Sequence, residues 1–150
     1  MTKLATHAMT KALSISALLC LGACLRPPDY SIIPTIALDS LSTLYIRAGV
    51  DSLKFFISFT DGDGDIGSET NPNLFLTDSR TGYTDSVKVP YITPDGSLKA
   101  ISGVIIYVRS QFSCIPGRKT DSLTYTIYLE DRAGHASNSV TTPVIYLECQ

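Results

Sequence analysis

Two segments of this 150-residue chain, Ser52–Thr60 and Ser122–Glu130, alternate apolar and mostly polar residues with a strict period of two. Because successive side chains of a β-strand point to opposite faces, this alternation predicts two strands that each bury one face. Two such strands can face each other across a hydrophobic core. The apolar positions are Leu53, Phe55, Ile57, Phe59, Leu123, Tyr125, Ile127 and Leu129.

Weaker strand signals occupy most of the chain after residue 30, separated by clusters of Gly, Pro, Asn and Asp, and no convincing helical period interrupts them. We therefore predict an all-β domain of about seven to eight strands. Because successive turns are only a few residues apart, an antiparallel β-sandwich is favoured over a parallel sheet, which would need helical crossovers. A closed, lipocalin-like barrel is the structural alternative. The remaining strand candidates are Ile32–Leu38, Thr43–Arg47, Asn73–Thr77, Ser86–Ile92, Ala100–Arg109 and Ser139–Glu148.

The N-terminal segment has the pattern of a targeting sequence. Lys3 and Lys11 give it a positive start, and the apolar run Ala12–Leu21 is too short to span a bilayer comfortably as a permanent helix. The run ends in Leu21-Gly22-Ala23-Cys24, which resembles the lipobox cut by the lipoprotein signal peptidase. An ordinary signal peptide and a short transmembrane anchor are the alternatives.

This resemblance implies that residues 1–23 are a signal peptide and that the mature protein begins at Cys24, whose thiol carries a diacylglycerol. Because two or more acyl chains hold a protein stably at a membrane, a triacylated Cys24, with palmitate as a typical chain, would be a durable anchor. Residues 24–29 form a short tether in which Pro27 and Pro28 block a helix, and residues 30–150 form one domain.

Charge argues against a nucleic-acid partner. Removing residues 1–23 removes two of the twelve Lys and Arg residues and none of the fourteen Asp and Glu residues, which leaves a formal net charge of −4. The chain has no basic stripe and no arginines alternating with aromatics, which a phosphate-binding surface would use.

Two cysteines remain after processing. Cys20 is discarded with the signal peptide and Cys24 is lipidated, which leaves Cys114 and Cys149 in an oxidising compartment. We predict a disulfide between them. Two free buried thiols and a metal-binding pair are the alternatives.

An acidic run, Asp61-Gly62-Asp63-Gly64-Asp65, follows the first alternating strand. Glycines between the acids let the backbone curl, so that three carboxylates can face one centre, and calcium prefers such hard oxygen ligands. The run matches only the start of an EF-hand loop, because glycine is needed where Ile66 stands and glutamate where Pro72 stands. A bare solvated turn and a catalytic carboxylate pair are the alternatives to a cation site.

Three segments together resemble Bacteroidetes-type lipoproteins with an immunoglobulin-like domain, a group that is mostly uncharacterised. They are Phe59–Gly67, Tyr128–Asn138, and the cysteine that closes the final strand, Cys149. The second segment is similar to the last hairpin of bacterial Ig-like domains, with His135 where such turns usually have Asn. The resemblance implies an Ig-like antiparallel β-sandwich and an envelope location rather than an activity.

An Ig-like strand order would bring a fourth acid to the acidic run. The strands Ser52–Thr60 and Ser122–Glu130 would end at the same pole, so that Asp131 approaches the 61–65 loop. Four carboxylates without a cation would repel one another and raise their pKa values. We therefore predict a Ca²⁺ site formed by Asp61, Asp63, Asp65 and Asp131.

No catalytic apparatus is visible in the mature sequence. A Ser-His-Asp triad would have to use His135, the one histidine after residue 23, and it lies at a predicted hairpin tip without a nucleophile elbow. Tyr125 fits either a tyrosine corner or a core aromatic, and the second is favoured.

The sequence therefore predicts a non-enzymatic, membrane-anchored binding or structural domain of the cell envelope, stiffened by calcium at one pole. Its partners would be the membrane, through the lipid anchor, and an unknown envelope protein or glycan. Leu25 after the lipidated cysteine, in place of a retaining aspartate, favours the outer membrane on either of its faces. The alternatives are a sugar- or small-ligand-binding module and an enzyme that uses the acidic pole.

Overall fold

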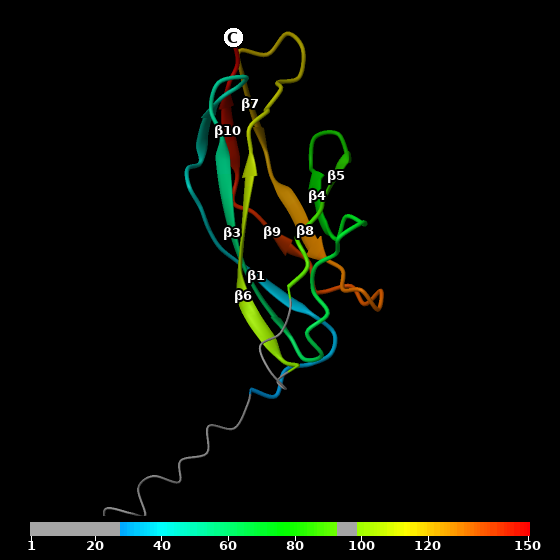
Figure 1. Cartoon of the computed structure of the whole chain (residues 1–150). Helices are drawn as coiled ribbons and strands as arrows, with labels where there is room; N and C mark the ends of the chain where they lie inside the picture. The colour runs from blue at the N-terminus through cyan, green and yellow to red at the C-terminus, as the bar shows by residue number, and fades with distance from the viewer. Residues whose placement is uncertain (1–27, 93–98) are drawn as a thin grey trace, which may run out of the picture.

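The computed structural model describes residues 28–92 and 99–150, which form ten strands in three sheets and contain no helix (Figure 1). The predicted all-β class is thereby confirmed. Across these two ranges, no helix has the length and apolarity needed to cross a membrane. The predicted signal peptide and Cys24 lie outside the described residues. The strands are β1 Thr35–Leu41, β2 Tyr45–Arg47, β3 Leu53–Asp61, β4 Leu74–Asp78, β5 Thr84–Val87, β6 Ile101–Arg109, β7 Thr120–Leu123, β8 Tyr125–Leu129, β9 Val140–Thr141 and β10 Ile145–Glu148.

The first sheet has the order β1-β3-β6, and both of its pairings are antiparallel. Alternate side chains of β3 are buried from Leu53 to Asp61, so the predicted inward face is confirmed. The strand continues one step beyond Thr60, which places Asp61 on the same inward face as Phe59. An acidic side chain thus ends a row of core residues.

The other strands form sheets of order β2-β10-β7 and β5-β4-β8-β9. Within them only β2 and β10 pair in parallel. Figure 1 shows β7 and β10 towards the end of the molecule where the C-terminus lies, whereas the described chain enters at the opposite end. The molecule therefore has an entry end and a C-terminal end.

Two predicted strands are each divided in the structure. Ser122–Glu130 is split into β7 and β8 at Thr124, whose N–H donates to Ser79 Oγ at 3.0 Å and whose carbonyl accepts the Ser79 N–H at 3.0 Å. These contacts take the backbone groups of Thr124 away from a neighbouring strand. Ser139–Glu148 is split into β9 and β10 around Pro143, which has no N–H to donate to a ladder.

The predicted strand Ser86–Ile92 is wrong in extent, because β5 already ends at Val87. Beyond it, the Val89 N–H donates to the side chain of Asn73 at 2.8 Å instead of to a strand backbone. The first strand also begins later than predicted, at Thr35, directly after Pro34.

One hydrophobic core joins the three sheets, with buried side chains from β1, β2, β3, β4, β7, β8 and β10. Tyr125 is fully buried and meets Phe55 edge-on, which confirms its reading as a core aromatic. Cys114 and Cys149 form a disulfide, with their Cα atoms 6.0 Å apart, which confirms the predicted bond. Because such bonds persist in oxidising compartments, the disulfide indicates an extracytoplasmic location.

Candidate metal centre

Asp61 is the last residue of β3, and its inward orientation leaves its side chain without solvent exposure. One carboxylate oxygen, Oδ2, accepts the Asp65 N–H at 2.9 Å. This hydrogen bond closes the loop that follows β3. Asp61 therefore combines the position of a core residue with the chemistry of a ligand.

Glycines permit the course of this loop for two different reasons. A Cβ on Gly62 would lie 2.3 Å from the Tyr30 carbonyl oxygen, because the chain entering the domain packs directly against the loop. The Gly62 N–H donates to the Ser31 carbonyl at 2.8 Å. Gly64 has a φ of 72°, which glycine adopts without a steric penalty. The loop is thus clamped to the entering chain and curls back on itself.

The curl brings Asp61, Asp63 and Asp65 together, with one carboxylate oxygen from each within 4.8 Å of the others. Each of the three side chains also has a buried Oδ1 atom with no hydrogen-bond partner among the described residues. A buried acceptor left unpaired costs about 1–3 kcal/mol, so three in one loop call for a compensating group. A cation coordinated by these oxygens supplies one.

The pKa shifts in the loop also favour a bound cation. Burial raises the pKa of Asp61, and the charges of Asp63 and Asp65 raise it further, against the opposing effect of the Asp65 N–H bond. Burial also raises the pKa of Asp65, with smaller contributions from the charges of Asp131 and Asp63. The ionised forms are therefore disfavoured until positive charge enters the cluster.

Arg132, whose charge acts on Asp65, is held mainly by other contacts. Arg132 Nη1 donates to the carbonyl oxygens of Ile66 and Gly67, both at 3.2 Å, and its guanidinium lies over the Tyr91 ring at 4.4 Å from the centroid. Its charge lowers the pKa of Asp65 only as the weakest of the contributions to that group. Arg132 therefore fixes the loop backbone more than it neutralises the acids.

Asp131 is brought to the same pole as the loop, and its charge acts on Asp65. The segment after Asp131 touches the 61–65 loop directly, because the Ala133 N–H donates to Asp65 Oδ2 at 3.1 Å. Asp131 itself lies outside the group of three converging carboxylates. Its Oδ1 accepts the His135 N–H at 2.8 Å, and its Oδ2 lies 2.7 Å from His135 Nδ1. The structure thus places Asp131 beside the cluster, paired with a histidine.

The side chain of His135, which the sequence places at a hairpin tip, is 38% exposed. Its contact with Asp131 closes the turn after β8. A hollow of about 320 Å³ next to this turn is lined by residues 67–68, 70–73 and 130–132, and none of the three clustered carboxylates lines it.

The packing of Tyr30 and Ser31 on the loop was not apparent from the sequence, because no local pattern links residues that are more than thirty positions apart. A glycine before an acid was the only signal, and Asp-Gly pairs also occur in ordinary turns. The sequence identified the clustered acids but not the segment that holds them.

Comparisons with known proteins give no assignment. No protein-family model matches the sequence, and a search of curated proteins finds no match.

Proposed function

We propose that the protein is a lipid-anchored lipoprotein of the cell envelope, with an Ig-like β-sandwich domain that binds or supports a partner without catalysis. The observation that carries the proposed cation-dependent stabilisation is the set of three buried, unpartnered carboxylate oxygens at the end of β3. The lipobox-like Leu21–Cys24 sequence supports the anchor, and the disulfide agrees with an envelope location.

The strand order supports the Ig-like assignment. An Ig sandwich places its first, second, fourth and fifth strands in one sheet and its third, sixth and seventh in the other. The sheet β1-β3-β6 fits the first, second and fifth of these strands, and within the described residues it has no fourth strand. The strands β4, β8 and β9, with β5 as an added edge strand, fit the second sheet. The breaks at Thr124 and Pro143 divide the sixth and seventh strands of that scheme into the pairs β7 with β8 and β9 with β10.

Calcium is the cation that we assign to the loop. The converging atoms are all carboxylate oxygens, which suit hard cations. Calcium accepts six to eight oxygens in flexible geometry, whereas magnesium demands a nearly ideal octahedron. A loop that curls at glycines and is closed by the hydrogen bond from the Asp65 N–H to the Asp61 carboxylate suits the more tolerant ion.

An enzyme using the acidic pole is the rival function. Asp61, Asp63 and Asp65 do not line the hollow beside the pole. Substrates need a concave site next to the reacting groups, so the geometry favours a structural role for the cluster.

The experiment that tests the anchor is fractionation and intact-mass analysis of the full chain expressed in a Gram-negative host. Wild type should be membrane-bound, with an acylated Cys24 as its first residue. Cys24→Ala should lose acylation, whereas the matched variant Cys20→Ala, within the same signal segment, should stay anchored. Recovery of an unacylated wild-type chain that begins elsewhere would contradict the proposal.

A further inference from the structure

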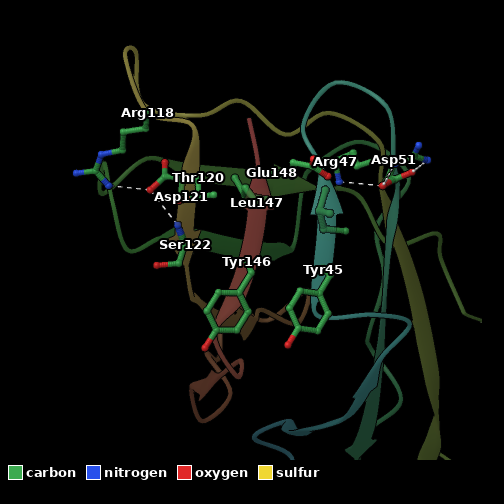
Figure 2. A pocket seen from close by; sticks show the side chains of 11 residues that line it. Tyr45, Arg47, Asp51, Arg118, Thr120, Asp121, Ser122, Tyr146, Leu147 and Glu148 are labelled. Atoms are coloured by element: carbon green, nitrogen blue, oxygen red, sulfur yellow. Dashed lines mark hydrogen bonds and ion pairs between the residues drawn. The ribbon is translucent and has the colours of Figure 1, made fainter. Parts of the chain in front are cut away.

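The outer surface of the sheet β2-β10-β7 carries an aromatic pair. Tyr45 and Tyr146 are opposite each other in the parallel register of β2 and β10, with ring centroids 5.5 Å apart and ring planes 18° apart. Tyr45 is 72% exposed and Tyr146 is 48% exposed. Figure 2 shows the rings side by side, with their hydroxyl groups at the same end. Two large aromatic rings thus form one broad surface open to solvent.

Polar side chains from neighbouring positions of β2, β10 and β7 border the tyrosine pair on the same surface. The next outward row joins Arg47, Glu148 and Thr120, and Ser122 continues the tyrosine row on β7. The six outward residues of these two rows define what we call the tyrosine face. They are Tyr45, Arg47, Thr120, Ser122, Tyr146 and Glu148.

The charged groups on and beside this face are pre-positioned. Arg47 makes a two-point contact with Asp51, through Nε at 3.0 Å and Nη2 at 2.7 Å, which fixes the guanidinium plane. Arg118 donates to Asp121 at 2.8 Å at the other side of the face. Within the described part of the chain, the carboxylate of Glu148 has no hydrogen-bond partner, so it is available as an acceptor. Donors and an acceptor therefore flank the aromatic surface.

These residues line an open hollow of about 930 Å³ (Figure 2), within the range of about 300–1,000 Å³ that is usual for ligand sites. A cross-strand aromatic pair stabilises a sheet by itself, as Phe75 and Tyr128 do on β4 and β8. That second pair is only partly exposed. Sheet stability explains why Tyr45 and Tyr146 touch, but it does not explain their exposure or the hollow.

We propose that the tyrosine face is a glycan-binding site, which takes an extended chain of pyranose sugars across Tyr45 and Tyr146. The C–H faces of sugar rings are weakly positive and pack on the negative faces of aromatic rings. Sugar hydroxyls donate to carboxylates and accept from guanidinium groups, which matches Glu148 and Arg47. A protein partner would favour a larger apolar surface with fewer charges at its centre.

This inference rests on the proposed role as a binding domain and assigns its ligand class. The tyrosine face lies towards the C-terminal end of the molecule, whereas the acidic pole lies at the end where the chain enters. Glycan binding should therefore be independent of calcium. That independence separates the tyrosine face from a sugar site built on the carboxylates.

The test uses the full acylated chain in a sugar-free detergent and two glycan probes, soluble xylan and purified peptidoglycan glycan strands. Binding is followed by affinity electrophoresis and calorimetry, with and without EGTA. Wild type should bind at least one probe. Tyr45→Ala and Tyr146→Ala should each weaken binding about tenfold, since an aromatic contact is worth up to roughly one factor of ten. Glu148→Gln should weaken it several-fold.

Tyr83→Ala is the matched control, because Tyr83 is also 66% exposed but lies in the turn between β4 and β5. It should bind as wild type does, and all variants should melt within a few degrees of wild type. Binding to xylan alone or to peptidoglycan strands alone would identify the source of the glycan. Three outcomes would overturn the inference: wild type binds neither probe, EGTA abolishes binding, or both tyrosine variants bind as tightly as wild type does. Loss of acylation or of the calcium-dependent melting shift in the same preparations would instead count against the proposed function.

Discussion

Replacing Asp61 by asparagine should change stability in opposite directions with and without calcium. The asparagine carbonyl can still accept the Asp65 N–H, which Asp61 Oδ2 accepts at 2.9 Å. Its NH₂ group would stand where the unpartnered Oδ1 faces the carboxylates of Asp63 and Asp65. The substitution therefore removes a repelling charge and adds a donor, but it also removes a cation ligand.

The magnitudes follow from these changes. Relieving a buried, unpaired acceptor is worth about 1–3 kcal/mol, which raises the melting temperature of a domain of about 120 residues by roughly 4–12 °C in the absence of metal. A cation that binds only the folded state stabilises wild type by about 2.7 kcal/mol at a hundredfold excess over Kd, or roughly 10 °C. The variant should lose most of that second gain. In chelator the variant should therefore melt above wild type, and calcium should raise the melting temperature of wild type far more than that of the variant.

Thermal unfolding followed by circular dichroism, in millimolar calcium and in EGTA, measures all four values. Glu69→Gln is the matched control, because it removes an exposed carboxylate from the same connection without touching the cluster. It should behave as wild type does. A wild-type curve that is indifferent to calcium and to EGTA would show that the loop is a bare turn. An Asp61→Asn variant that is destabilised equally in both conditions would show that the carboxylate serves only the fold.

The same cluster sets a dependence on pH. Burial raises the pKa of Asp61 and of Asp65, so the metal-free folded state binds protons more readily than the unfolded state. Its stability should therefore rise as pH falls from 7 towards about 4, the region above the unfolded pKa of aspartate. Protons compete with the cation, so the calcium shift should shrink over the same range. Asp61→Asn should flatten both trends.

Three further changes should alter stability measurably. Reduction of the bond between Cys114 and Cys149, which are 35 residues apart, should remove about 4 kcal/mol in the chain-entropy model, and a melting curve unchanged by reductant would contradict this. Gly62→Ala should cost about 1–3 kcal/mol, since its Cβ would overlap the Tyr30 carbonyl, and an unaffected variant would show that the entering chain does not pack there. Asp121→Asn should lower the melting temperature by several degrees at pH 7, and the difference from wild type should begin to shrink as the pH falls below about 4. Although burial opposes it, hydrogen bonds from backbone amides and from arginine side chains hold the pKa of Asp121 well below its usual range, so its contribution is lost only progressively in acid. A difference that does not shrink as the pH falls would refute this.

The sequence pattern was enough to predict a strand that packs on the core along its whole length. The alternation in Ser52–Thr60 predicted β3 and its buried face, because one side of that strand packs on the core along its whole length. The same pattern in Ser122–Glu130 concealed the break at Thr124, whose cause is a backbone contact with Ser79, forty-five residues away. Alternation reports which side is buried, and it carries no information about where a neighbouring strand stops.

The two candidate sites differ in the same way. The acidic cluster was predictable, because Asp61, Asp63 and Asp65 lie in one short loop whose glycines let it curl. The tyrosine face was not, because Tyr45 and Tyr146 are brought together only by the parallel pairing of β2 with β10. A strand of three residues gives too short a pattern for sequence to reveal its register.

The point where the chain enters the domain links the acidic loop to the proposed anchor. The Gly62 N–H donates to Ser31 at 2.8 Å, so the loop lies against the first described residues of the chain. Only six positions separate Cys24 from Tyr30, a span of at most about 20 Å even when fully extended. An anchor at Cys24 would therefore keep the acidic loop near the membrane surface, where cations concentrate beside anionic lipids. The strands β7 and β10 lie towards the other end of the molecule, so the same anchor would leave the tyrosine face accessible to a long glycan.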